Sequence, residues 1–290
     1  MKELFSRTFK YFKRDISVWI LGIIIYALIM TICISLSLLI GIFDILAIFF
    51  VSMPFLISFI LMAWKSNDAL SLSNEDIYLG YKNMTFNISI AIKKLAPAML
   101  FTLLFYFGIQ VVLIFFDFIF IDQNIFIEYI KFSKDASIEE AYTWLLSQET
   151  LLSHLRIVSY VSIALSLVFI NVIANKKIFS IIFLYRLKNP RFNYDYIVRN
   201  KKELKSHKLY LYNGIISLFY VVGVIVAILL SLVLNKVIDN SIIAYVISAL
   251  SFFLISSFVI PFKYIPYVYL FNKYFEDDFS WLFVDIIKEQ

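Results

Sequence analysis

The stretch that decides how this chain sits in a membrane reads KKIFSIIFLYRLKNPRFNYDYIVRNKKELKSHK and covers residues 176–208. It carries ten of the 26 lysine and arginine residues and lies between two long apolar runs. Lysine and arginine residues close to the ends of membrane spans are retained in the cytoplasm. We therefore expect this segment to be cytoplasmic and to set the orientation of the whole chain.

The composition favours an integral membrane protein. Hydrophobic residues make up 62% of the 290 residues and charged residues only 16%, whereas a soluble domain has about 25% charged residues. The mean hydropathy is +0.86. Several apolar runs reach the ~20 residues that a helix needs to cross ~30 Å of hydrocarbon. The single cysteine, Cys33, lies in one of these runs, so a disulfide within the chain is excluded.

We predict an all-α, polytopic helical bundle with six membrane spans that forms one membrane domain, residues 1–290. The spans are expected at about residues 18–40, 45–64, 97–121, 157–177, 209–234 and 242–261. The segments outside the spans are an outer loop at 122–155, the basic cytoplasmic segment 176–208 and an amphipathic C-terminal tail at 262–290.

Positive charge is sorted onto one side of this arrangement. The residues that fall on the opposite side or at its boundary are Lys131, Lys134, Arg156 and Lys236. An even number of spans with both termini in the cytoplasm accounts for this distribution. The abundance of Ile, Phe, Asn, Lys and Tyr is typical of a low-GC bacterial genome, so we expect a multi-pass protein of the bacterial cytoplasmic membrane.

Two connections contain the pattern of a helix start. Ser73 with Asp76, and Ser137 with Glu140, have the spacing of a capping box, in which each side chain bonds the backbone of the other residue. Each pair precedes apolar residues at helical spacing. We expect short amphipathic helices that lie at the membrane interface.

Parts of the second half resemble a group of bacterial multi-span proteins, the domain-of-unknown-function family 975. The resemblance lies in Phe179-Ser180, Tyr185, Asn189-Pro190, Ser206-His207-Lys208, Pro266-Tyr267 and Tyr274, and in residues 76–82 of the first half. It covers about half of the chain. The resemblance implies a helical membrane bundle and no particular reaction.

Amide side chains inside the predicted spans are the first candidates for a functional site, since polar groups are costly in hydrocarbon. They are Gln110, Asn171, Asn175 and Asn213. They either line a polar pathway or form hydrogen bonds between helices, and we favour the second. Asp44, Asp117 and Lys263 fall near the expected span ends, so no charge lies near a midplane. An ion-coupled transporter usually needs such a charge.

A second candidate is a basic helix in the cytoplasmic segment. Its cations are Arg199, Lys201, Lys202, Lys205 and Lys208. Each can contribute ~1 kcal/mol to binding anionic head groups. We expect contact with the lipid bilayer or with a protein partner in the membrane. A nucleic-acid partner is not expected, because the segment is short and tethered to the membrane.

Sequence patterns for catalysis or metal binding are weak. The two histidines, His154 and His207, are far apart and outside the spans' interiors, and the pair Glu139-Glu140 lies in a polar loop. We predict no catalytic residue, metal site or cofactor. The expected function is that of a non-enzymatic membrane protein, such as a transporter or secretion accessory, or an immunity factor against membrane-active peptides. The alternatives are a small-solute or lipid permease and, third, an intramembrane enzyme.

Overall fold

The described residues are helical throughout, apart from short turns. The computed structural model describes residues 2–37, 47–68, 70–120, 149–173, 175–187, 207–238 and 241–276, together with 127–128, 130–131, 137, 140 and 143–144. No strand occurs among them. The predicted all-α class is therefore confirmed for this part of the chain.

The helices follow one another in a simple order. They are α1 (Lys2–Arg14), α2 (Ile16–Ser37), the π-helix η1 (Ala47–Ser52), α4 (Met53–Asn67), the 3-10 helix η2 (Asn74–Tyr81), α5 (Met84–Phe120), α8 (Glu149–Ile173), α9 (Asn175–Leu187), α11 (His207–Val237), α12 (Ser241–Ser257), α13 (Val259–Phe271) and the π-helix η4 (Asn272–Glu276).

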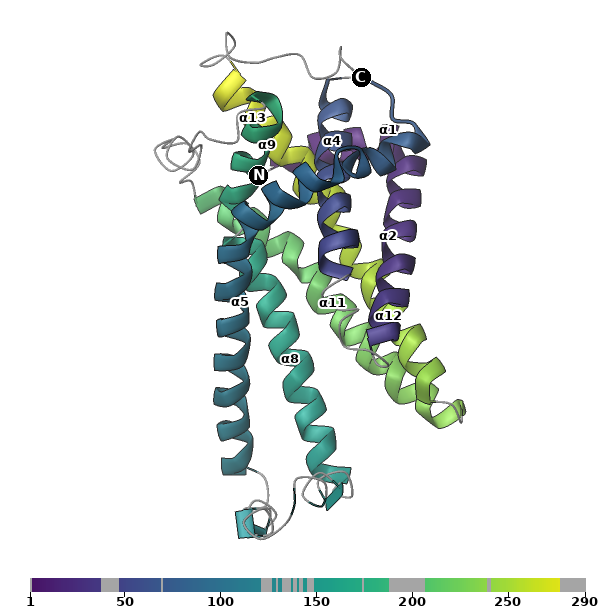
Figure 1. Cartoon of the computed structure of the whole chain (residues 1–290), viewed down its shortest axis with the longest axis vertical. Helices are drawn as coiled ribbons and strands as arrows, with labels where there is room; N and C mark the ends of the chain where they lie inside the picture. The colour runs from purple at the N-terminus through teal and green to yellow at the C-terminus, as the bar shows by residue number, and fades with distance from the viewer. Residues whose placement is uncertain are drawn as a thin grey trace. The chain divides into compact units, whose positions relative to one another are not determined.

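The chain divides into two compact units. The larger unit comprises residues 1–99 and 170–290, and the smaller comprises residues 100–169. In the larger unit α13 packs against α1, α4, α9 and α11, while α12 packs against α2 and α11 (Figure 1). The last helices of the chain therefore bring together elements from both sequence halves.

Aromatic rings fill the centre of the larger unit. The fully buried ones include Trp19, Phe55, Phe59, Phe179, Phe183, Tyr267, Phe271 and Phe275. Phe183 contacts Phe271 and Phe275 with ring centroids 4.7 and 4.8 Å apart. Such pairs add about 0.5–1.5 kcal/mol each beyond the area they bury. They fix the position of α13 against α9.

The smaller unit contains the second half of α5 and most of α8. The apolar segment Leu100–Phe116 of α5 exposes large side chains, among them Leu104, Phe107 and Phe115 at 53–66%. Phe105 stacks on Phe169 of α8 with 3.9 Å between ring centroids. Such exposed apolar helix faces suit contact with lipid or with another membrane helix.

Several helices have the length and composition of membrane spans. Among the described residues these are Ile16–Leu36, Phe50–Asn67, Leu209–Leu234 and Ile243–Phe275, and a fifth is present if the broken pair α8–α9 counts as one span. The described helices are therefore long and apolar enough to cross a membrane, as the sequence predicts. The count of six spans and the placement of the termini stay predictions.

The helical path continues past residue 261, where the sequence analysis places the end of the last span. Helix α13 runs to Phe271, and most of its side chains are buried. A proline in the first turn of a helix removes no helical hydrogen bond, so Pro261 does not interrupt the helix. The candidate span Ile243–Phe275 includes Lys263, and the bounds of the last span stay a prediction.

Candidate functional site

Two of the predicted amides meet between helices of the larger unit. The Asn171 amide Nδ2 donates to the Asn213 carbonyl oxygen at 3.2 Å and to Ser217 Oγ at 2.6 Å. The Asn213 amide Nδ2 donates to the Tyr267 hydroxyl at 2.7 Å. The exposed fraction of all four residues is 1% or less. These hydrogen bonds link α8, α11 and α13.

The same amides leave two acceptors unused. Asn171 Oδ1 and Asn213 Oδ1 are buried and have no hydrogen-bond partner among the described residues. A buried acceptor without a donor costs ~1–3 kcal/mol. The two oxygens are therefore available to a bound water or to another donor.

The structure describes the side-chain contact of one of the other two predicted amides. Gln110 Nε2 donates to the Tyr106 hydroxyl one turn earlier in α5, at 2.6 Å, so its hydrogen bond stays within one helix. Asn175 is the first residue of α9, and its side chain lies outside the described residues.

The predicted basic helix lies mostly outside the described structure. Arg199, Lys201, Lys202 and Lys205 fall in the part of the chain that is not described. Lys208 is the second residue of α11, but the surroundings of its side chain are likewise not described. Lipid or partner contact through these residues stays a prediction.

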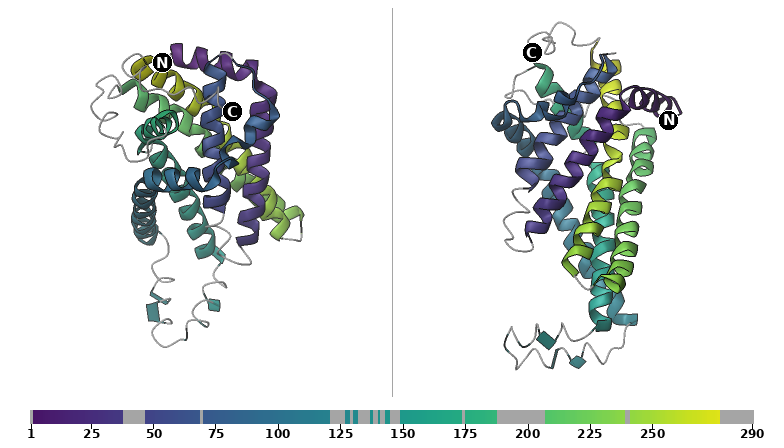
Figure 2. Two further views of the ribbon diagram at one scale, coloured as in Figure 1. Left: turned by 45° about the horizontal axis from the view of Figure 1, so that its top comes forward. Right: turned by 90° about the vertical axis from the view of Figure 1, so that its right-hand side faces the viewer.

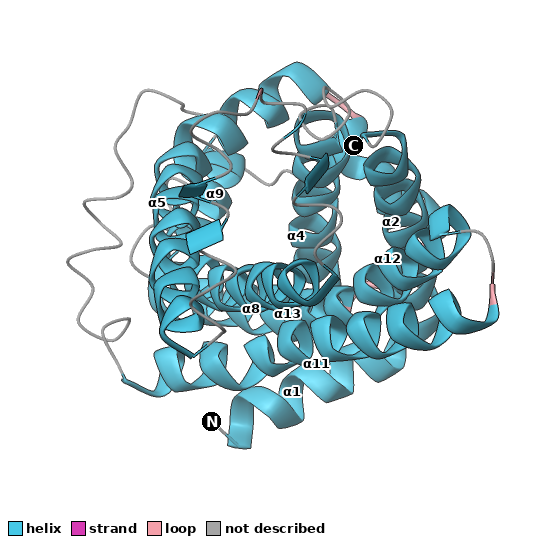
Figure 3. Cartoon of the chain, turned by 90° about the horizontal axis from the view of Figure 1, so that it is seen from below, coloured by secondary structure: helices cyan, strands magenta, loops and turns pink. Residues whose placement is uncertain are grey.

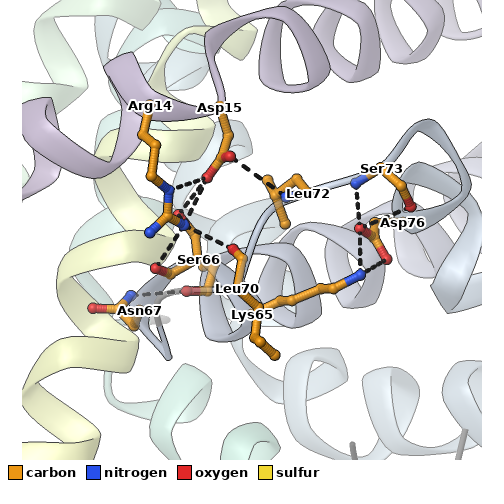
Figure 4. Close-up of polar contacts among 10 residues, drawn as sticks. Arg14, Asp15, Lys65, Ser66, Asn67, Leu70, Leu72, Ser73 and Asp76 are labelled. Carbon is orange, nitrogen blue, oxygen red and sulfur yellow. Dashed lines mark hydrogen bonds and ion pairs between the residues drawn. The ribbon is translucent and has the colours of Figure 1, made fainter.

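A buried charge network not predicted from the sequence joins the start of α2 to the end of α4 (Figure 4). Asp15 Oδ2 accepts hydrogen bonds from Arg14 at 2.8 and 3.0 Å and from Ser66 Oγ at 3.2 Å. Arg14 also donates to the carbonyl oxygens of Ser66 and Leu70, at 3.0 and 2.8 Å. The exposed fraction of the Asp15 side chain is 7%. The network holds the corner between α1 and α2 against α4.

A second buried ion pair lies next to it and confirms the capping box at Ser73. Lys65 Nζ donates to both carboxylate oxygens of Asp76, at 3.0 and 2.9 Å. The backbone N–H and the hydroxyl of Ser73 donate to Asp76 Oδ2, at 2.7 and 3.2 Å. Asp76 therefore both caps η2 and binds Lys65 near the end of α4.

The second predicted capping box is also present. The backbone N–H and the hydroxyl of Ser137 each donate to Glu140 Oε2 at 2.9 Å. These two bonds stabilise the charged form and lower the pKa of the Glu140 carboxyl. The local spacing of the two residues was enough to predict the contact.

Tyr81 at the end of η2 has a different environment. Burial raises the pKa of its hydroxyl to about 12 because the charged phenolate loses its solvation. The hydroxyl donates to the Phe50 carbonyl oxygen at 3.1 Å. It therefore stays protonated and ties η2 to η1 at neutral pH.

The described structure is all-helical, with four or five helices long and apolar enough to cross a membrane, and buried hydrogen bonds brace its larger unit. No group of three or more His, Cys, Asp and Glu side chains in the described part of the chain could hold a metal ion. No protein-family model, curated protein or solved structure matches this chain. The resemblance to the domain-of-unknown-function family 975 therefore stays a hypothesis.

Proposed function

We propose that this chain is a non-enzymatic integral membrane protein that acts through its surfaces, on lipids or on a protein partner in the membrane. The observation that carries the proposal is the use of its interior polar groups. Asn171 and Asn213 bond across helices, and the buried carboxylates of Asp15 and Asp76 bond neighbouring segments. Polar groups that bond other parts of the fold are not available to a substrate. Their use supports a rigid bundle that binds its partners at the surface.

One observation favours a small-solute or lipid permease as a second candidate. Asn213 lies on α11, which packs against α13, and Asn171 of α8 donates to α11 through its amide nitrogen. The Oδ1 atoms of both amides have no hydrogen-bond partner among the described residues. Lys263, which has no ion-pair partner among the described residues, lies in the candidate span that includes α13. Unpaired polar groups inside a span are a common mark of a substrate path.

Reconstitution separates the two candidates. We expect the purified chain in liposomes to give no osmotic swelling above empty vesicles with amino acids, sugars or monovalent salts. In native membranes, chemical cross-linking should give a discrete complex with a second polypeptide, or mild detergent should retain bound lipid. The stably folded variant Asn171→Leu should keep both properties. Solute flux that Asn171→Leu abolishes would refute the proposal in favour of the permease.

We also propose six spans with both termini in the cytoplasm of a bacterial cell, which the sorting of positive charge supports. With Cys33 replaced by alanine, a new cysteine at Asn200 should react with a membrane-impermeant maleimide only after the cells are opened. A cysteine at Lys131, in the predicted outer loop, should react in intact cells and is the matched control. Labelling of position 200 from outside would contradict the orientation.

A further inference from the structure

The first helix lies across the direction of the spans. Helix α1 ends at Arg14 and α2 begins at Ile16, with a turn at Asp15 between them. Figures 2 and 3 both show α1 lying across the direction in which α2 and α4 run. The candidate span in α2 starts at Ile16. Because α1 ends two residues before Ile16, α1 lies at the membrane surface where this span begins.

The inner face of α1 is firmly attached to the bundle. Phe5 contacts Tyr212 of α11, with 4.7 Å between ring centroids, and Phe12 contacts Phe262 of α13 at 5.7 Å. Thr8, between them, is fully buried. A helix fixed at both ends of one face presents its other face in a constant orientation.

The outer face combines apolar and basic side chains. Phe9 is 57% exposed. Lys10 and Lys13 are exposed beside it, and neither has an ion-pair partner among the described residues. Lys13 lies one turn after Phe9 and three residues after Lys10, so these three side chains lie along one side of α1. Ile16, the first residue of α2 beyond the turn at Asp15, is 43% exposed.

Basic side chains also lie where α1 meets α13 and η4. The Arg7 guanidinium lies over the Tyr269 ring, 4.4 Å from its centroid, and Lys273 Nζ lies 6.0 Å from the same centroid. The Glu3 carboxylate accepts a hydrogen bond from the Tyr269 hydroxyl at 3.1 Å and pairs with Arg7 at 3.4 Å. The Tyr269 ring therefore has a cation from α1 and a cation from η4 beside it.

We propose that the outer face of α1 binds the anionic phospholipid leaflet at which α2 begins. Phe9 inserts among the acyl chains, as Ile16 does at the start of α2, while Lys10 and Lys13 lie at the lipid phosphates, as the cations of amphipathic interfacial helices do. Charge complementarity selects an anionic surface over a neutral one. This inference rests on the proposed function, because it names lipid as one class of surface partner.

A probe at position 9 tests the proposal in the full-length chain. With Cys33 replaced by alanine, Phe9→Cys is labelled with the fluorophore NBD and placed in nanodiscs that contain a spin-labelled lipid. Nanodiscs with phosphatidylglycerol should quench the probe at least about twofold more than nanodiscs of phosphatidylcholine alone. Lys10→Glu with Lys13→Glu should reduce the quenching to the neutral-lipid level.

The matched control carries the same change in net charge at two other exposed lysines. Lys82→Glu with Lys93→Glu should leave quenching at position 9 unchanged, and size-exclusion profiles should show that every variant is folded. The proposal is overturned if quenching at position 9 is equal in both lipids. It is also overturned if Lys10→Glu with Lys13→Glu does not reduce the quenching. Shielding of the probe from both the spin label and iodide also overturns it, because protein then covers this face. Solute flux through the bundle would refute the proposed function and leave the lipid result standing.

Discussion

Replacing Gly80 with alanine is expected to lower the thermal midpoint of this chain by roughly 5–10 °C, from about 3 kcal/mol of lost stability. A Cβ at position 80 would lie 1.8 Å from the Pro54 carbonyl oxygen and 2.9 Å from the Ser58 backbone nitrogen. Both are backbone atoms of the first turns of α4, so no side-chain rotation relieves the overlap. The 3-10 helix η2 would have to move away from α4.

The contacts of Gly80 explain why such a movement is costly. The Gly80 backbone N–H donates to Ser58 Oγ at 2.7 Å, and its carbonyl oxygen accepts from Asn87 Nδ2. Movement of η2 away from α4 would leave the Gly80 N–H without the Ser58 hydroxyl, at ~1–3 kcal/mol. Gly80 is therefore required by the close approach of two backbones.

Gly214→Ala is the matched control within the same unit. A Cβ at position 214, inside α11, meets nothing within 4 Å, and alanine in a helix interior stabilises by about 0.5–1 kcal/mol relative to glycine. Heating followed by fluorescence-detected size exclusion in detergent measures both variants. Equal midpoints for Gly80→Ala and Gly214→Ala would show that η2 does not pack against α4 as described.

Local contacts were the part of this structure that the sequence could predict. The capping boxes Ser73–Asp76 and Ser137–Glu140 join residues three apart, so the spacing alone indicated them. The apolar runs likewise predicted helices of spanning length, because the membrane imposes that length.

Contacts between distant residues could not be predicted in the same way. Asp15 and Ser66 are 51 residues apart, and no sequence pattern joins them. Asn171 and Asn213 were selected because amides are costly in a span, but their mutual bond depends on how α8 and α11 pack.

Removal of the Asp76 carboxylate is the second change expected to have a large effect. The Asp76→Ala variant should lose about 2–3 kcal/mol of stability, because breaking one side of a buried ion pair leaves the other charge uncompensated. The Asp76 side chain is 6% exposed, whereas that of Lys65 is 29% exposed. Lys65 keeps part of its solvation, so the expected loss lies below the full cost for a completely buried pair.

Asp76 also accepts the two hydrogen bonds from Ser73, so the variant loses the cap of η2 as well. Loss of an N-cap side chain costs ~1 kcal/mol. Glu75→Ala is the matched control: Glu75 is the exposed neighbour in the same helix, and its removal changes net charge equally. Its thermal midpoint should stay within about 2 °C of the unmodified chain.

A double variant separates the ion pair from the cap. Lys65→Met removes the partly exposed ammonium, so adding it to Asp76→Ala should restore part of the lost stability, since no charge is then left without a partner. The stability that is not restored measures the contribution of the two hydrogen bonds that Ser73 donates to Asp76. If the losses of the two single variants simply add, Lys65 and Asp76 are not coupled, and the buried pair does not hold α4 to η2. A recovery of about 1 kcal/mol or more would instead show that the pair fixes the position of η2 on α4, the same packing that leaves no room for a side chain at Gly80.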